Sequence, residues 1–266
     1  MFIIGNPTNI YLATSAGINF VEYFKVMFLP TLVGGLVELG ILLLLFWRKL
    51  KVPMEENSEE YKLESKVDTI IGLIHLGICI IMLIISSYLN IPMWLISVCA
   101  AGSLLIYILV KGICTKKMSV LGHTLKHLPY ELIPFVLSMF VVVVALNTQG
   151  VSVELEKLLE NDAPIWTYGS SSFLVANIIN NIPMSMLYAN LNSVSSVNHL
   201  PKIYASIVGS NIGAFLTPVG ALAGIMFTSL LRKYEVKYSF LDFIKYGAII
   251  AIPTLAATLG ILSFVL

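Results

Sequence analysis

Long apolar runs separated by short polar segments are the feature that most limits what this chain can fold into. One run extends from Val26 to Trp47, and others cover residues 67–88, 91–110 and 241–265. Because about 20 helical residues cross the roughly 30 Å apolar core of a bilayer, each run is long enough to span a membrane. With 58% hydrophobic and only 12% charged residues, a water-soluble domain would expose large apolar surfaces. The sequence therefore predicts an all-α integral membrane protein that crosses the plasma membrane several times, with the lipid bilayer as its first partner.

The charge and the cysteines exclude several classes of protein. The net charge is +1, and the basic residues form short clusters at helix ends, so no nucleic-acid partner is predicted. The three cysteines, Cys79, Cys99 and Cys114, have no paired spacing, and the first two lie in apolar runs where a thiol packs as a small hydrophobic group. There is also no metal-ligand spacing and no phosphate-binding glycine loop. No metal and no cofactor are predicted.

Basic clusters predict which helix ends face the cytoplasm. The run that ends at Trp47 is followed by Arg48, Lys49 and Lys51, and loops rich in Lys and Arg stay in the cytoplasm. Residues 51–66 are polar and mixed in charge, which predicts a cytoplasmic linker between two parts of the chain. The acidic segment that follows the span at 130–149 is predicted to be an outer loop.

Residues 163–200 contain polar, helix-breaking residues within an apolar stretch. A full crossing here would leave Arg232 and Lys233 outside after the next span, whereas a re-entrant hairpin that turns near Asn180 places them inside. The next stretch is interrupted at 209–220, which predicts a broken helix. The predicted organisation is the end of a first repeat at 1–50, the linker at 51–66 and a second repeat at 67–266, with scaffold spans at 67–149, the outer loop at 150–163, the hairpin at 164–200, the broken helix at 203–231 and a last span at 241–265.

A pattern at the start of a helix occurs twice. Residues 20–25 read FVEYFK and residues 240–245 read FLDFIK, and each copy is followed by a Pro-Thr-Leu triplet. By the charge rule the two copies cross in opposite directions, which predicts inverted repeats. Inverted repeats with paired broken helices are typical of secondary transporters, in which one midplane site faces either side in turn. Because the first repeat begins directly at its polar cluster, we expect an incomplete first repeat, in an N-terminally truncated transporter without its first hairpin.

The helix breaks predict where the site lies. In lipid each unsatisfied backbone group costs several kcal/mol, so a break persists where the freed groups line a cavity or bind a ligand. Nearby Asn, Ser and Thr side chains supply neutral ligands, and hydrogen bonding between helices stays open as the alternative. We expect the hairpin turn and the broken helix to converge near the midplane, with helix termini facing the substrate. The predicted substrate-binding residues are Asn177, Asn180, Asn181, Pro183, Gly209, Ser210, Asn211, Thr217 and Pro218, with Asn6, Pro7, Thr8 and Asn9 as the counterpart in the first repeat.

Glu38 lies near the middle of its apolar run, where an ionised carboxylate is costly and usually functional. It is a candidate proton-coupling group; the alternative is a neutral carboxyl or one bonded to a neighbour in its own helix. An intramembrane enzyme would need a second carboxylate, a Ser/His pair or a metal set at the same depth, and the sequence offers none beside it. We therefore predict no catalytic residues and no enzyme.

Two motifs carry a resemblance to a known family. Residues 177–183 read NIINNIP, and residues 209–220 read GSNIGAFLTPVG. Both resemble the arsenical pump membrane proteins, which belong to an ion transporter superfamily that includes sodium/proton antiporters of the NhaD type and citrate or dicarboxylate carriers. The resemblance covers nearly all of the chain and implies an inverted-repeat secondary transporter that exports arsenite or antimonite in exchange for protons, in some members with a cytosolic ATPase subunit. It assigns the site to Asn180, Asn181, Gly209, Ser210, Asn211, Thr217 and Pro218, with Gly5, Asn6, Pro7 and Asn9 from the first half.

Other functions remain open within this resemblance. Sodium/proton antiport and citrate or dicarboxylate transport use the same superfamily fold, although the absence of an obvious Arg or Lys near the breaks weakens a multiply charged anion. A truncated fragment that inserts but transports nothing is a further alternative. A small inorganic or organic ion is the expected substrate, and a homodimer is the other partner left open.

Overall fold

The computed structural model describes residues 2–52, 65–89, 91–115, 132–194 and 199–266, with the isolated residues 122, 126 and 130. Throughout these residues the regular secondary structure is helical. Four of their helices contain stretches long and apolar enough to cross a membrane, namely Phe20–Phe46, Lys66–Ser86, Met93–Thr115 and Phe240–Val265. This confirms the predicted all-α integral membrane fold. Most of the predicted linker, residues 53–64, lies outside the described residues.

The chain forms two compact units. Unit 2 covers Pro53–Leu132 and contains α3 (Lys66–Leu89) packed against α4 (Met93–Thr115). At the open end of this helical hairpin Asp68 forms an ion pair with Lys111 and accepts a hydrogen bond of 2.7 Å from the Tyr107 hydroxyl. The charged group at the start of one span is thereby neutralised by the charged group at the end of the next.

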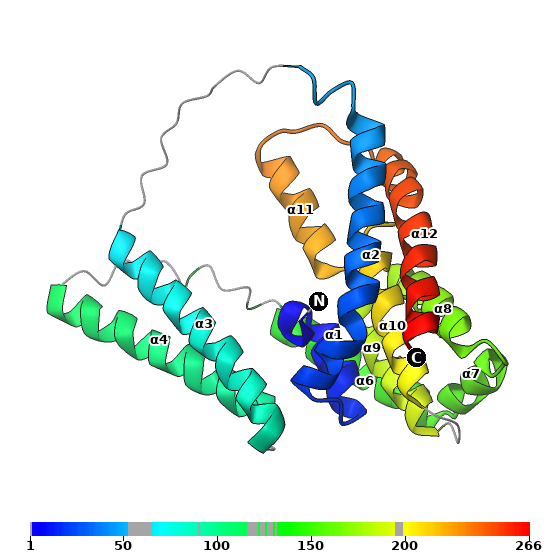
Figure 1. Cartoon of the computed structure of the whole chain (residues 1–266), viewed down its shortest axis with the longest axis horizontal. Coiled ribbons are helices and arrows are strands. Elements are labelled where there is room, and N and C mark those ends of the chain that lie inside the picture. The colour runs from blue at the N-terminus through cyan, green and yellow to red at the C-terminus, as the bar shows by residue number, and fades with distance from the viewer. Residues whose placement is uncertain are drawn as a thin grey trace. The chain divides into compact units, whose positions relative to one another are not determined.

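Unit 1 combines Met1–Val52 with Ile133–Leu266 and holds the predicted site residues. It begins with a short 3-10 turn, Ile3–Gly5, and also contains α6, an apolar helix of 17 residues. Figure 1 shows α2 and α12 lying side by side. In chain order its α-helices are α1 (Pro7–Ser15), α2 (Phe20–Phe46), α6 (Leu132–Thr148), α7 (Val151–Leu159), α8 (Pro164–Ile179), α9 (Asn181–Val194), α10 (His199–Gly213), α11 (Leu222–Lys233) and α12 (Phe240–Val265).

The α2 helix begins with a capping box. The Asn19 side chain accepts a hydrogen bond from the Glu22 backbone N–H at 2.9 Å, and the Glu22 carboxylate accepts one from the Asn19 N–H at 3.2 Å. This satisfies two of the backbone donors that a helix start leaves unpaired. Glu22, at the first of the two matching helix starts, therefore has a defined capping role.

Helices α2 and α12 are antiparallel along their shared length. Phe46 contacts Tyr246, with ring centroids 5.9 Å apart, while Gly34 lies against Thr258 near the other end of the contact. The residue numbers of the contacting pairs rise on one helix as they fall on the other. An antiparallel pair is what the repeated motif and its opposite crossing directions predict, and the inverted repeat itself stays a prediction.

Glycines let α8 and α10 approach closely. A Cβ atom on Gly209 would meet the backbone of α8, including the Phe173 nitrogen at 2.9 Å, and one on Gly213 would meet the Phe173 oxygen at 2.9 Å. Small residues at such crossings allow backbones in membranes to pack without intervening side chains. The contact fixes α10 against the first helix of the predicted hairpin.

The predicted outer loop contains a helix that the sequence pattern did not predict. Helix α7 is amphipathic and turns its buried face towards α8 and α9. Glu156 on this face is 6% exposed and forms an ion pair of 2.7 Å with Lys202 of α10, which is 3% exposed. Tyr168 of α8 also donates a hydrogen bond to Glu156. The acidic residues of this segment suggest a solvated loop. The helix was missed because nine residues give only a weak periodic signal.

Candidate functional site

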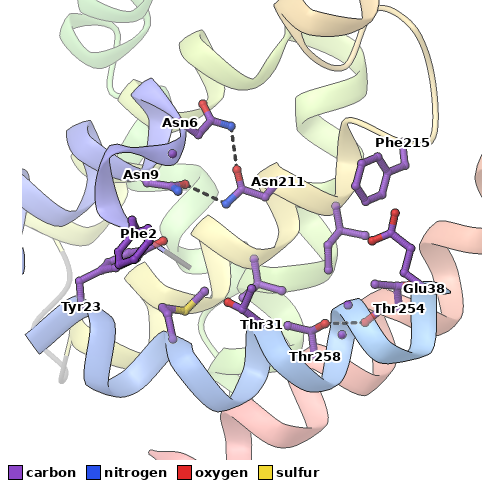
Figure 2. A pocket seen from close by; sticks show the side chains of 16 residues that line it. Phe2, Asn6, Asn9, Tyr23, Thr31, Glu38, Asn211, Phe215, Thr254 and Thr258 are labelled. Atoms are coloured by element: carbon purple, nitrogen blue, oxygen red, sulfur yellow. Dashed lines mark hydrogen bonds between the residues drawn. The ribbon is translucent and has the colours of Figure 1, made fainter. Parts of the chain in front are cut away.

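A pocket of about 290 Å³ lies between α1, α2, α10 and α12 in unit 1. We call it the amide pocket, because Asn6, Asn9 and Asn211 line it. Figure 2 shows Phe2 and Tyr23 at one end of this pocket and Glu38 and Phe215 at the other. Its remaining lining consists of Gly5, Met27, Thr31, Gly34, Gly35, Val208, Ile212, Thr254 and Thr258.

Three amides connect the start of the chain to α10. The Asn6 amide donates a hydrogen bond to the Asn211 side-chain oxygen at 2.7 Å, and the Asn211 amide donates one to the Asn9 side-chain oxygen at 2.8 Å. The Asn6 oxygen also accepts from the Thr8 N–H and caps α1, with Pro7 at the first helical position. Asparagine at the cap and proline after it form a strong helix-start signal. The helix start therefore holds two of the three amides at the pocket.

Helical spacing explains which residues face the pocket. On α10 the lining positions Val208, Asn211 and Ile212 follow the three- and four-residue steps of one helix face, while Gly209 faces α8. Phe215 lines the pocket from the turn just after α10. The lining residues of α2 follow the same steps between Tyr23 and Glu38. The two faces meet because α2 and α10 both pack against α12.

Threonine hydroxyls on α2 and α12 add polar groups to the pocket wall. The Thr258 hydroxyl donates a hydrogen bond to the Thr254 backbone oxygen at 2.7 Å, and Thr254 donates to the Ile250 oxygen at the same distance. Thr31 and Thr254 occupy equivalent positions in the two Pro-Thr-Leu triplets. The repeated triplet could therefore have indicated both threonines as site residues. The triplets were used only to align the two repeats.

Glu38 contributes the carboxylate of the pocket. It is half-buried, and no hydrogen bond or ion pair joins it to the residues that the structure describes. Lys and Arg are absent from the described lining of the amide pocket. The pocket thus offers neutral hydrogen-bonding groups and one acidic group that can carry a proton.

Four other predicted site residues, Asn177, Asn180, Asn181 and Thr217, form a second cluster, in which the hairpin turn is bound to the break after α10. Asn180 has φ of 73°, a left-handed backbone, and its amide donates a hydrogen bond to the Val219 oxygen at 2.9 Å. The Asn181 N–H donates to the Gly220 oxygen at 3.1 Å. These bonds satisfy backbone groups that both breaks would leave free in lipid.

Asn177 and Thr217 complete this cluster. The Thr217 hydroxyl donates to the Asn177 side-chain oxygen at 2.7 Å, and the Asn177 amide donates to the Gly213 oxygen at 2.9 Å. These contacts match the alternative of hydrogen bonding between helices. Of the thirteen predicted substrate-binding residues, only Asn6, Asn9 and Asn211 line the amide pocket; Pro7, Thr8, Asn177, Asn180, Asn181, Pro183, Gly209, Ser210, Thr217 and Pro218 do not.

Three of these residues keep an unsatisfied buried oxygen. The hydroxyls of Thr8 and Ser210 and the side-chain oxygen of Asn181 have no hydrogen-bond partner within the described part of the chain. Thr8 is 1% exposed, Ser210 is fully buried and Asn181 is 4% exposed. Buried polar atoms without partners are uncommon and often mark a bound water or ion. Their helices, α1, α10 and α9, contact one another in unit 1.

Comparison with known proteins identifies the family. The family model of the arsenical pump membrane protein matches residues 1–266. An arsenical pump membrane protein of Escherichia coli K12 is 27% identical over 98% of this chain and 62% of its own length. A relative with the same name in Yersinia enterocolitica is 26% identical over 98% and 62%, and an uncharacterized transporter of Synechocystis sp. is 25% identical over 97% and 62%.

The chain spans about 62% of the length of these curated relatives. No solved structure matches it. The relatives are named as pumps or transporters, and the described apolar helices agree with a multi-pass protein of the plasma membrane. Because the family model covers the whole chain, this protein belongs to the arsenical pump membrane protein family.

Proposed function

We propose that this protein exports arsenite or antimonite, as the neutral trihydroxides, in exchange for protons. The observation that carries the proposal is the composition of the amide pocket, in which neutral amides and hydroxyls surround the space beside one carboxylate. A trihydroxide donates and accepts hydrogen bonds and carries no charge, so amide and hydroxyl groups suit it without a cation. At about 30 Å³ for each water, the volume of about 290 Å³ admits such a solute with part of its hydration.

Glu38 is the proposed proton carrier. A carboxylate in a membrane helix is costly when ionised, and a bound proton removes that cost. In the proposed exchange the carboxylate takes a proton at one side of the membrane and releases it at the other. The trihydroxide binds to the amides and crosses in the opposite direction. Asn6, Asn9 and Asn211 bind the solute hydroxyls, and Thr31 and Thr254 supply further hydroxyl contacts.

Sodium/proton exchange is the second candidate. The unsatisfied oxygens of Thr8, Asn181 and Ser210 favour it, because neutral and anionic oxygens are the ligands that hard cations take. Citrate or dicarboxylate transport is less well supported, since the described lining of the amide pocket holds no basic side chain to bind a carboxylate. An ATPase subunit and a homodimer stay predictions.

Arsenite accumulation in arsenic-sensitive cells that express this chain tests the proposal. We expect several-fold lower accumulation than in cells without it, and loss of that difference in Thr31→Val, which removes a pocket hydroxyl while keeping the side-chain shape. Thr228→Val is the matched control, because the Thr228 hydroxyl bonds to the Ile225 oxygen of its own helix at 2.9 Å and is not among the pocket residues. Unchanged accumulation despite confirmed membrane insertion would refute arsenite export.

Everted vesicles separate the coupling ion from the substrate. An imposed pH gradient is expected to drive arsenite uptake, and Glu38→Gln is expected to abolish this uptake while leaving exchange of labelled for unlabelled arsenite intact. If a sodium gradient drives uptake and a pH gradient does not, proton coupling through Glu38 is wrong.

A further inference from the structure

A second pocket shares a wall with the amide pocket. It has a volume of about 660 Å³ and also lies in unit 1, between the second half of α2, α11 with the loop that follows it, and the first half of α12. Glu38 and Phe215 line both pockets. The two spaces therefore meet at these two side chains, which Figure 2 shows at the same end of the amide pocket.

The far end of the second pocket is polar and lies at the basic end of α2. Lys237, Ser239 and Asp242 are exposed and line this pocket. Because α2 and α12 are antiparallel, the start of α12 lies at the same end as the residues that follow α2, where Phe46 contacts Tyr246. Arg48 and Lys49 lie just beyond Phe46, so the rule that places basic ends inside puts this opening at the cytoplasmic face.

Phe215 is held at the junction by the break in the helix. Its N–H donates a hydrogen bond to the Ile212 oxygen at 3.0 Å, in a turn that ends α10. Its backbone passes directly over Gly247 of α12, where a Cβ atom would meet the Phe215 carbonyl carbon at 3.2 Å. The break thus brings an aromatic side chain, 38% exposed, to the boundary between the two pockets.

We propose that the second pocket is the cytoplasmic vestibule of the amide pocket and that Phe215 and Glu38 form the gate between them. A small neutral solute enters past the exposed polar residues near Asp242, crosses between the aromatic ring and the carboxylate, and reaches the amides. The same path carries water to Glu38, which gives its carboxyl a route for proton exchange with the cytoplasm. Phe215 sets the width of the path because its ring is the bulky group at the junction.

This inference rests on the proposed transport function, but accessibility can be measured without transport. Labelling of single cysteines by a small, charged, membrane-impermeant methanethiosulfonate tests it in a background of Cys79→Ser, Cys99→Ser and Cys114→Ser. Ile250→Cys probes the vestibule and Thr31→Cys probes the amide pocket. Ile252→Cys is the matched control, since this residue lies two positions further along α12, is 57% exposed and lines neither pocket. Lys49→Cys marks the side of the membrane at which the basic end lies.

We expect the cysteines to be labelled from one side of the membrane and at different rates. Reagent applied at the side that labels Lys49→Cys also labels Ile250→Cys, and it labels Thr31→Cys more slowly. Phe215→Ala raises the rate at Thr31→Cys several-fold and leaves the rate at Ile250→Cys unchanged, while Ile252→Cys stays unlabelled. The proposal is overturned if Thr31→Cys reacts only from the opposite side, or if Phe215→Ala leaves its rate unchanged. If the cysteines are labelled as expected but the protein does not export arsenite, the vestibule is supported and arsenite as the substrate is refuted. If the protein exports arsenite but the labelling pattern is absent, only the vestibule is refuted.

Discussion

At the residue scale, Asn211 connects segments that lie about two hundred positions apart in the sequence. Its side chain accepts from Asn6 and donates to Asn9, so one amide uses both its polar ends. Asparagine is suited to this position because it combines a donor and an acceptor without charge. An ionised aspartate of the same shape could not donate to the Asn9 oxygen.

We expect Asn211→Ala to lower the stability of the protein by about 1–3 kcal/mol, since it leaves polar partners at Asn6 and Asn9 without their bonds. Thermal unfolding of the purified protein in detergent measures the change as a shift of several degrees in Tm. Asn147→Ala, at an exposed position of α6, is the control and should change stability by less than about 0.5 kcal/mol. Equal Tm values for the two variants would contradict a connecting role for Asn211.

At the scale of the elements, the crossing of α8 and α10 depends on glycine. Helix α10 carries Asn211 on one face and Gly209 on the other, so the distance between α10 and α8 decides how far the amide reaches into the pocket. The hydrogen bond from Asn177 of α8 to the Gly213 oxygen strengthens the same contact. One face of α10 thus forms the close crossing with α8, and another face lines the amide pocket.

Gly209→Ala should separate these helices. The new Cβ atom would meet backbone atoms of α8, including the Phe173 nitrogen at 2.9 Å, and backbone cannot move aside as a flexible side chain does. We expect a loss of about 1–3 kcal/mol from overpacking, measured by thermal unfolding in detergent. Gly40→Ala in α2 is the control, since nothing lies within 4 Å of the added atom and alanine favours the helix by about 1 kcal/mol. A stable Gly209→Ala with a destabilised Gly40→Ala would reverse the expected order.

At the scale of the whole molecule, the sequence predicted the features that local composition determines. Apolar run length indicated the spanning helices, and clusters of Asn, Gly and Pro marked the turn at Asn180 and the interruption after Gly213. The repeat predicted that the polar cluster at residues 6–9 is the counterpart of the polar residues at the broken helix, and the structure joins Asn6 to Asn211 by a hydrogen bond. These features depend on residues close together in the chain.

The features that the sequence did not predict depend on how distant helices pack. Thr258 and Phe215 line the pocket because of the register between α2, α10 and α12, and no local pattern encodes that register. The sequence predicted that the polar residues converge on one site. In the structure some of them line the amide pocket, and others form the hydrogen-bonded second cluster at the hairpin turn. The pairing of Glu156 with Lys202 was missed because its partners lie 46 residues apart and each looks solvent-exposed in its own segment.

That buried pair makes a prediction about how the molecule is held together. Glu156 and Lys202 are each less than one-tenth exposed, and their ion pair joins α7 to α10. Removing one charge leaves the other buried without this partner, so Lys202→Met alone should cost about 3–5 kcal/mol. Thermal unfolding in detergent should show a much smaller loss for the double variant Glu156→Leu with Lys202→Met, because apolar residues of similar size can replace a buried pair at little cost or with a gain.

The exposed pair of Lys157 with Glu154 is the matched control on the same helix. These side chains are 63% and 72% exposed, and Lys157→Ala should change stability by less than about 1 kcal/mol. If the double variant is as unstable as Lys202→Met, the two charges do not act mainly on each other, and the bonds from α7 to α8 stabilise this part of the molecule instead. If it recovers stability yet arsenite accumulation stays high, the pair contributes to transport beyond holding the helices.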